Sequence, residues 1–257
     1  MSKSVLKTAS EIESMRKAGS VAARVLREAS QLISPGVTTQ DIDARVGEII
    51  RGKGAVSAFY RYRDFPGQCC ISVNDGVIHG IGGRRRLQLG DLVKLDVGVR
   101  FEGMVGDVAM TVACGGCTPA AQKLMDVTIK ALYDGVSFAR AGNTVTTVGR
   151  AVQKRVESNG FGVVREFCGH GVGRSVHEDP QVPNYDDGRR GGIRLKPGMT
   201  IAIEPMVTAG KPAVKILDDG WTVVTQDRQF AAHFEHTVLV TDGDPEILTR
   251  DDLPDLY

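Results

Sequence analysis

The sequence lacks the features that mark membrane-bound and secreted chains. No apolar stretch approaches the roughly 18 residues that a transmembrane helix needs. The first residues, MSKSVLKTASEIES, contain neither the apolar core nor the small-residue cleavage site of a secretory signal. The charges are also balanced, with 32 Lys and Arg against 31 Asp and Glu. Charge therefore gives no reason to expect a nucleic acid or a membrane as partner, and we expect a cytoplasmic protein.

Cysteine is equally scarce, and its pattern excludes a disulfide-stapled scaffold. The five Cys are an odd number spread over 257 residues, which is typical of a reducing compartment. Cys114 and Cys117 form a CxxC without a second pair, a weak zinc signal to which we assign no role. The length and the absence of a long linker predict one domain, residues 1–257, with residues 1–9 as a flexible N-terminus.

The chain shows the same order of elements twice: two helices followed by strands. Apolar periodicity and caps predict helices at 10–33, 39–52, 118–140 and 145–158, with capping boxes at Ser10–Glu13 and Thr38–Asp41. The expected strands lie at 55–60, 69–73, 91–101, 104–113, 162–168, 199–207, 221–226 and 233–241. This repetition indicates an internal pseudo-duplication. Residues 181–198, rich in Gly, Pro and charge, are expected to form a surface loop.

Two neighbouring strands carry one acid each. Glu102-Gly103 predicts a hairpin turn between VKLDVGVRF and MVGDVAMTV. If Phe101 pairs with Met104, Asp107 lies opposite Gly98 and Asp96 opposite Ala109. The two Asp are then diagonal neighbours on one face, about 7–8 Å apart. We expect the small residues that face them to leave room for ions and water.

Three further ionisable residues sit among apolar or small neighbours, as these two Asp do. A charge in such a setting costs several kcal/mol unless it is paired or binds a metal. The set therefore predicts a shared site for more than one cation, and its carboxylate-dominated chemistry suits Co, Mn, Fe or Zn. Two bridged ions would generate a hydroxide nucleophile near neutral pH. The five residues are Asp96, Asp107, His170, Glu204 and Glu235.

These residues lie in motifs that resemble those of the type I methionine aminopeptidases in their short bacterial form. The matching segments are NDGVIHGIG, LDVGVRFEGMVGDVAMTV, CGHGVGRSVHEDPQVPN, GMTIAIEPM and FEHTVLVTDG. The resemblance spans about residues 10–248. It implies the α/β (α+β) pita-bread fold, a pseudo-twofold antiparallel sheet covered by two pairs of helices. It also implies a metalloaminopeptidase that removes the N-terminal methionine from nascent proteins with a small second residue, by attack of water activated at two divalent ions.

The resemblance also implies individual roles. Asp96, Asp107 and Glu235 correspond to ligands that can touch both ions, and His170 and Glu204 to ligands of one. Glu204 further resembles the proton acceptor and donor. His79 corresponds to a contact near the substrate amide, and His177 to a residue that steadies the carbonyl oxygen. The pocket for the first side chain is implied at Phe59, Tyr62, Phe65, Cys70 and Trp221.

The sequence departs from the family pattern at several positions. Phe59 replaces a smaller residue, Phe65 a Tyr and Val176 an aromatic. We interpret Phe59 and Val176 as an exchange of bulk across the pocket. His233 also departs from the pattern, and we assign it no role.

Two alternatives come from the same fold. One is an X-Pro aminopeptidase or prolidase, which would carry an extra N-terminal domain for which the position of Asp96 leaves no space. The other is a non-catalytic peptide-binding paralogue, which would have lost metal ligands. As partners the resemblance implies N-termini of nascent polypeptides, without direct nucleic-acid or membrane contact. A monomer is expected, with Arg84–Arg86 as the only tight basic run for docking to the ribosome.

Overall fold

Four α-helices form in the part of the chain that the computed structural model describes, residues 6–186, 188 and 192–250. They are α1 (Ala9–Ser30), α2 (Thr39–Gly52), α3 (Pro119–Ser137) and α4 (Val145–Glu157). A single turn of 3₁₀ helix, η1, covers Tyr62–Asp64. None of the described helices is both long and apolar enough to cross a membrane.

The helices begin at threonine caps. Thr38 and Thr118 each accept a backbone hydrogen bond three residues on, as predicted. The predicted box at Ser10 and Glu13 was wrong, because Thr8 and Glu11 have the same spacing and form the capping box instead. Ser10 is thereby inside the first turn of α1.

The segment before α1 was expected to be flexible. Residues 1–5 lie outside the described residues. From Lys7 onward the chain is held in place: Lys7 is buried and its ammonium donates to Glu178 at 2.6 Å, while its backbone N–H donates to Gly198. The described part of this segment is therefore anchored against the body of the molecule.

One large antiparallel sheet dominates the fold. Its strands follow the order β1-β4-β5-β14-β9-β7-β8, with β2 added on β4 and β15 on β14. Two three-stranded sheets, β13-β10-β6 and β11-β12-β3, complete the described strands. The bounds are β1 (Val56–Ser57), β2 (Cys70–Val73), β3 (Gly76–Ile78), β4 (Leu92–Phe101), β5 (Met104–Ala113), β6 (Gly162–Val163), β7 (Gly169–Gly171), β8 (Glu178–Val182), β9 (Thr200–Ile203), β10 (Met206–Thr208), β11 (Val214–Ile216), β12 (Val223–Thr225), β13 (Ala231–His233), β14 (Glu235–Leu239) and β15 (Glu246–Ile247).

The β4–β5 hairpin has the predicted register. Phe101 pairs with Met104, Gly98 with Asp107 and Asp96 with Ala109. Glu102 and Gly103 both adopt positive φ, 47° and 81°, as a tight two-residue turn requires. The two Asp therefore occupy one face of the sheet, as alternation along each strand demands.

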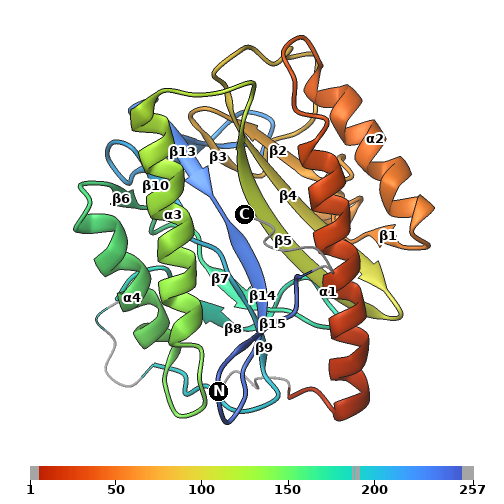
Figure 1. Cartoon of the computed structure of the whole chain (residues 1–257), viewed down its shortest axis with the longest axis vertical. Coiled ribbons are helices and arrows are strands. Elements are labelled where there is room, and N and C mark those ends of the chain that lie inside the picture. The colour runs from red at the N-terminus through yellow and green to blue at the C-terminus, as the bar shows by residue number, and fades with distance from the viewer. Residues whose placement is uncertain (1–5, 187, 189–191, 251–257) are drawn as a thin grey trace.

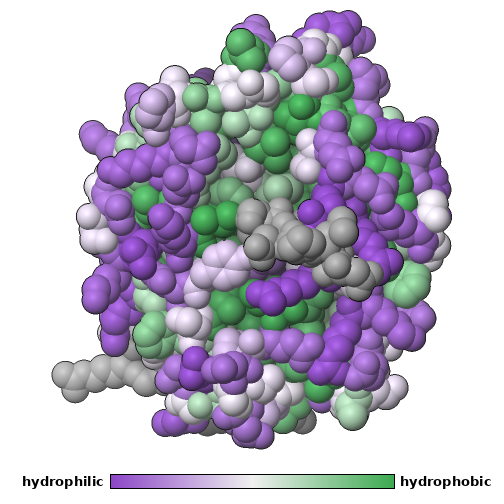
Figure 2. Space-filling view, viewed as in Figure 1, coloured by the Kyte–Doolittle hydropathy of each residue, from purple (hydrophilic) through white to green (hydrophobic). Residues whose placement is uncertain are grey.

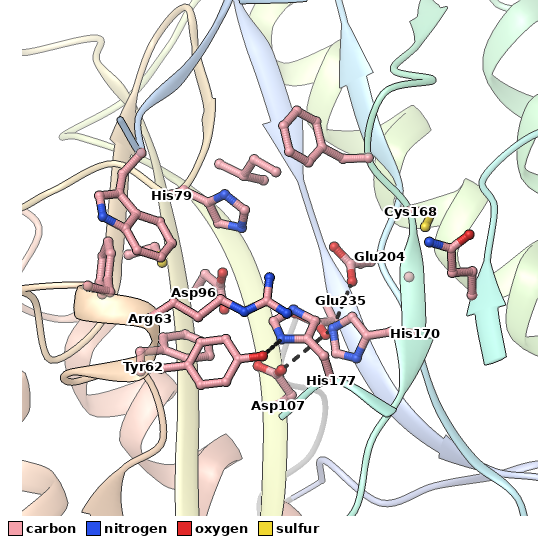
Figure 3. Close-up of a pocket in the computed structure, with 18 of the residues that line it drawn as sticks. Tyr62, Arg63, His79, Asp96, Asp107, Cys168, His170, His177, Glu204 and Glu235 are labelled. Carbon is pink, nitrogen blue, oxygen red and sulfur yellow. Dashed lines mark hydrogen bonds and ion pairs between the residues drawn. The ribbon is translucent and has the colours of Figure 1, made fainter. Parts of the chain in front are cut away.

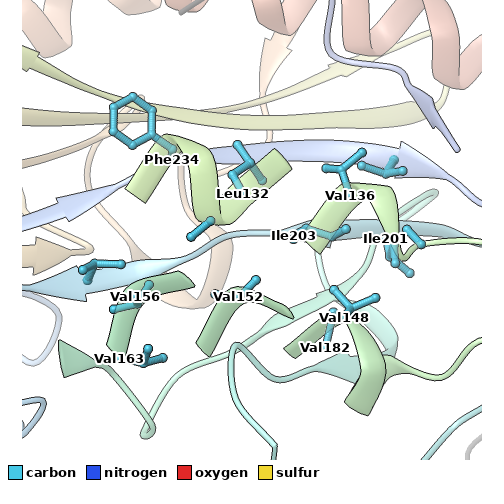
Figure 4. Close-up of a cluster of buried hydrophobic side chains, with 14 of the residues drawn as sticks. Leu132, Val136, Val148, Val152, Val156, Val163, Val182, Ile201, Ile203 and Phe234 are labelled. Atoms are coloured by element: carbon cyan, nitrogen blue, oxygen red, sulfur yellow. The ribbon is translucent and has the colours of Figure 1, made fainter. Parts of the chain in front are cut away.

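The predicted pseudo-duplication appears as two similar halves (Figure 1). The helices α1 and α2 cover the half built from β4 and β5, while α3 and α4 cover the half built from β9 and β14. Each helix pair has its own apolar core, and Figure 4 shows the second one, where Val148 and Val152 of α4 approach Ile201 and Ile203 of β9. The halves meet where β14 pairs with β5, through Glu235 with Ala109 and His236 with Val108.

On the helical side of the molecule, polar side chains cover the exposed helix surfaces and apolar ones show in the furrow between the helix pairs (Figure 2). In the part of the chain that the structure describes, none of the four α-helices covers the opposite face of the sheet. It is the face to which the site residues turn.

Several expected segments differ from the prediction. The strand expected at 55–60 is reduced to β1, Val56–Ser57, and the strand expected at 162–168 to β6, Gly162–Val163. The strand 199–207 is broken after Ile203 by Glu204-Pro205, and the strand 233–241 is broken at Phe234. The segment 181–198 is only partly a surface loop, because Gln181 and Val182 belong to β8 and Asn184 is buried. Residues 187 and 189–191 lie outside the described residues.

Candidate active site

The two Asp of the hairpin point away from the helices. Gly106 lies so close to α1 that a Cβ there would stand 2.5 Å from the carbonyl oxygen of Ala18. Because side chains alternate along β5, the neighbouring Asp107 must project to the opposite face. Asp96 shares that face, and both residues line the same cavity.

The other half of the molecule brings three more candidate ligands to this cavity. Glu235 is the first residue of β14 and pairs with Ala109, His170 lies in the middle of β7, and Glu204 follows the end of β9. Ligand atoms of Asp107, His170 and Glu235 all lie within 4.8 Å of one another. The Nε2 atom of His170 is 3.3 Å from Oε1 of Glu204 and 4.0 Å from Oδ2 of Asp107 (Figure 3). Segments distant in sequence thus converge on one point.

Burial and mutual repulsion disfavour the ionised acids. Burial, followed by the charge of Glu204, raises the pKa of Asp96 to about 8. Burial also raises the pKa of Asp107 and of Glu235 well above the ordinary range, and in each case neighbouring acids add to it. Among the described residues, Oδ1 of Asp96 and Oδ1 of Asp107 have no hydrogen-bond partner. Buried acid oxygens without donors, beside an imidazole, fit a divalent cation.

Glu204 behaves differently because two imidazoles flank its carboxylate. Burial raises its pKa, but the imidazoles of His170 and His233 beside its two oxygens outweigh burial and lower the pKa to about 2. Burial lowers the pKa of His170, and the contact with Glu204 outweighs it and raises this pKa to about 9. Nδ1 of His170 lies 2.9 Å from the carbonyl oxygen of Gly171. When Nδ1–H donates there, Nε2 is directed at the acids.

A cavity of about 760 Å³ surrounds this cluster. All twelve residues predicted for the site line it, from the five candidate ligands to the implied substrate pocket. Nine lining residues were not predicted: Arg63, Ile78, Glu166, Phe167, Cys168, Gly169, Glu178, Asp179 and Gln181.

The aromatic wall of the cavity has a specific construction. Phe59 packs onto Gly98, whose added Cβ would stand 2.4 Å from the Phe59 ring. The space opposite Asp107 is therefore filled by Phe59, and the expectation that Gly98 leaves room for ions and water was wrong. Phe65 and Trp221 meet edge to face with ring centroids 5.0 Å apart. Val176 belongs to the same apolar cluster as Phe59 and Phe65.

The two further histidines of the cavity are held by aromatic neighbours. His79 has φ of 57° and contacts the rings of Phe167 and Trp221 edge to face. The Nδ1 atom of His177 lies 3.0 Å from the hydroxyl oxygen of Tyr62. Burial lowers the pKa of both imidazoles to about 4, so both are neutral at pH 7.

His233 is the ionisable neighbour of this site to which the sequence gave no role. It is 1% exposed and its Nε2 lies 3.7 Å from Oε2 of Glu204, on the side away from His170. Its place at the end of β13, two residues before Glu235, was the available signal. The break at Phe234, which sets where His233 points, could not be read from the sequence.

The fold and the cluster of buried acids define a metal-dependent hydrolase of the pita-bread architecture. The chain belongs to metallopeptidase family M24, whose profile matches residues 13–242. The predicted fold class is thereby confirmed.

Comparisons over nearly the full length of the chain show its similarity to the methionine aminopeptidases within this family. The chain is 44% identical to methionine aminopeptidase 1 of Bacillus subtilis over 246 residues, which are 96% of this chain and 99% of that protein. The solved structure of methionine aminopeptidase from Thermotoga maritima matches with a TM-score of 0.94 at 42% identity, covering 97% of this chain and 100% of that one. A prolidase from Pyrococcus furiosus shares the fold alone, with a TM-score of 0.78 at 24% identity over 66% of its own chain.

Proposed function

We propose that this protein is a methionine aminopeptidase that removes the first methionine from newly made polypeptides with a small second residue. The observation that carries the proposal is the convergence of Asp107, His170 and Glu235 within 4.8 Å, in a cavity that also holds Asp96 and Glu204. Near-complete coverage by methionine aminopeptidases at 44% identity supports the same activity.

Two divalent ions are the proposed cofactors, of Co, Mn, Fe or Zn. Asp96, Asp107 and Glu235 would hold both, and His170 and Glu204 one each. Four carboxylates are more negative charge than one divalent ion balances, which supports a pair. When bound, such ions supply Lewis acidity, which lowers the pKa of water and polarises a carbonyl.

The side chains of the cavity supply the rest of the chemistry. Glu204, ionised because of its two imidazole neighbours, accepts a proton from the attacking water and passes it to the leaving amine. His177 donates a hydrogen bond to the carbonyl oxygen as negative charge develops on it. His79 contacts the substrate near its amino end and scissile amide.

The first side chain of the substrate would occupy the apolar wall of the cavity. Phe65, Cys70 and Trp221 present rings and a thiol, and Phe59 and Tyr62 line the same cavity. A slot of this kind suits an unbranched thioether, because sulfur packs well against aromatic rings.

The test is hydrolysis of Met-Ala-Ser by protein treated with chelator and then reloaded with Mn²⁺ or Co²⁺. We expect turnover only after reloading. Cleavage of an X-Pro dipeptide alone would favour the prolidase alternative, and binding without turnover under every metal would favour a peptide-binding paralogue. An active preparation free of bound ions would contradict the metal site.

A cytoplasmic monomer that meets its substrates at the ribosome is part of the same proposal. Arg84, Arg85 and Arg86 precede β4 at the surface and are the basic run available for docking.

A further inference from the structure

We propose that Tyr62 is a positioning residue for His177, whose imidazole it holds in the tautomer with the proton on Nε2. The inference rests on the proposed function, in which His177 must donate a hydrogen bond. It gives Tyr62 a second role besides that of a wall of the substrate pocket.

The loop that carries Tyr62 has an unusual backbone. Arg61, Arg63 and Asp64 have φ of 63°, 49° and 68°, although none of them is glycine. Residues with a Cβ rarely adopt this left-handed conformation, and runs of it persist only where surrounding contacts enforce it. The loop is fixed by backbone hydrogen bonds from Arg61 to Phe65 and from Tyr62 to Phe59, both 2.8 Å long. These hydrogen bonds hold the loop beside the cavity, which Tyr62 lines.

Tyr62 contacts His177 in two ways. Its hydroxyl lies 3.0 Å from Nδ1, and the two rings are stacked with centroids 5.3 Å apart and an interplanar angle of 27°. The guanidinium of Arg63 lies over the Tyr62 ring, 5.4 Å from its centroid. The His177 ring thus packs between Tyr62 and His170, whose ring centroid lies 4.2 Å from its own, and the Tyr62 hydroxyl contacts one particular nitrogen. Figure 3 shows the pair at the cavity, with the Tyr62 hydroxyl turned to His177.

The contact between the phenol and Nδ1 has two possible directions, and each corresponds to a different tautomer of the imidazole. When the phenol donates to Nδ1, the proton must sit on Nε2, which can then donate to a substrate carbonyl oxygen. When Nδ1–H donates to the phenol oxygen instead, Nε2 carries a lone pair and would repel that oxygen. Only the first arrangement performs the proposed role of His177. An imidazole without the phenol would divide its population between the two forms.

The first experiment compares Tyr62→Phe with wild type on Met-Ala-Ser. Phe keeps the ring stack and the apolar wall but removes the hydroxyl. We expect kcat to fall roughly tenfold, the equivalent of about one hydrogen bond, with KM changed less than about twofold. In a His177→Ala background the same substitution should have no further effect, because the partner is gone.

Tyr60→Phe is the matched control. Tyr60 lies in the same loop, is 45% exposed and has an arginine, Arg61, over its ring at the same 5.4 Å. It does not line the cavity. Removing its hydroxyl should leave kcat and KM unchanged.

The second experiment reads the tautomer itself, by ¹⁵N NMR of the histidine side chains in the metal-free protein. The chain has five histidines, and loss of one set of signals in His177→Ala assigns His177. Wild type should show a protonated Nε2 and a bare Nδ1, and Tyr62→Phe should shift both signals toward the mixed values. This readout does not depend on turnover, so failure of the proposed peptidase activity would leave it decisive.

Two results would overturn the inference. One is a Tyr62→Phe variant with raised KM and unchanged kcat, which would make Tyr62 a pocket wall only. The other is a wild-type His177 with its proton on Nδ1.

Discussion

Glu204 shows how much of this site depends on the surroundings of single side chains. Both Glu204 and Asp96 are carboxylates that line the cavity, yet the pKa of Glu204 is lowered to about 2 while that of Asp96 is raised to about 8. The difference comes from imidazole neighbours on both of its oxygens, His170 at 3.3 Å and His233 at 3.7 Å. Glu204 is thereby the acid of the cluster that stays ionised without a cation.

We predict that Glu204→Gln lowers kcat by roughly 10²–10⁴-fold, the range that a general base contributes. The amide keeps the shape of the side chain but cannot accept a proton. The measurement is steady-state hydrolysis of Met-Ala-Ser at saturating Mn²⁺, with Glu166→Gln, an exposed acid at the same cavity, as the control that keeps activity. Nearly normal kcat in Glu204→Gln would refute the role.

Phe59 is the second residue with a specific consequence, because its ring fills the space above Gly98. We predict that Phe59→Cys enlarges the pocket and raises the kcat/KM ratio of Leu-first to Met-first peptides about tenfold or more, the scale of a change of one or two methylene groups. Phe59→Leu, which keeps most of the volume, is the comparison. Unchanged relative rates for Phe59→Cys would show that Phe59 does not limit the pocket.

The candidate ligands could be predicted from the sequence because charged residues are rare among buried, apolar neighbours. The five candidate ligands stand out by their apolar or small neighbours, and all of them line the cavity. Arg63 and His233 did not stand out. Arg63 lines the cavity because the loop has a left-handed backbone, and no residue type in the loop predicts that conformation. The orientation of His233 depends on the break in the strand at Phe234.

Helix α1 packs closely against strand β5 on the face opposite the site. The contact is possible because Gly106 has no side chain, and the backbone of Ala18 and Gly19 lies against it. The following residue, Asp107, is thereby set at a fixed depth relative to the helix layer. The packing of Gly106 on one face of β5 thus positions the carboxylate of Asp107 on the other face.

We predict that Gly106→Ala destabilises the protein by about 1–3 kcal/mol, the usual effect of overpacking. The new Cβ would meet the Ala18 carbonyl oxygen at 2.5 Å, a backbone atom that cannot rotate away. Urea denaturation measures the difference, and Gly52→Ala, at a helical position with open space around it, should cause no loss. Equal stability of Gly106→Ala and wild type would show that α1 shifts without penalty.

Elements were predictable where two local signals agreed. The β4–β5 register followed from a turn and from alternation together, and α2 from a cap and an apolar stripe. The start of α1 was missed because Thr8 and Ser10 offer the same capping spacing. Short strands such as β7 and β13 were missed because their hydrogen-bond partners lie far away in sequence, and three residues carry no period.

The whole molecule carries an electrostatic strain that divalent ions would relieve. Without ions, burial raises the pKa of Asp96, Asp107 and Glu235, and contact with Glu204 raises that of His170 to about 9. Between pH 7 and 9 the folded chain therefore holds more protons at these groups than the unfolded chain. Stability linked to such groups is lost as pH rises through their folded pKa.

Other groups make the protein more stable as pH rises, and fewer of them titrate between pH 7 and pH 9. Burial lowers the pKa of Lys94 to about 7, so its contribution to stability grows as pH rises above 7. The histidines with lowered pKa have largely titrated below pH 7 in the unfolded chain as well. They are His79, His177 and His236.

We predict that the melting temperature of chelator-treated protein falls from pH 7 to pH 9. Added Mn²⁺ should raise it, and by more at pH 9, because an ion binds ionised carboxylates and neutral imidazole. Thermal denaturation with and without Mn²⁺ measures both effects. A metal-free protein that becomes more stable over this range would contradict the assigned protonation of the cluster.

The junction between the halves gives a bound ion one more consequence. β5 and β14 share two paired positions, and Thr237 adds hydrogen bonds with the backbone of Asp107. The candidate ligands come from both sides of this junction. An ion held there is a cross-link between distant stretches of chain, in a protein whose five cysteines are all free thiols. Unlike a disulfide, this link is released on unfolding, so its strength follows the concentration of free ion. The supply of metal, rather than the redox state, would then add to the strength with which the two halves are joined.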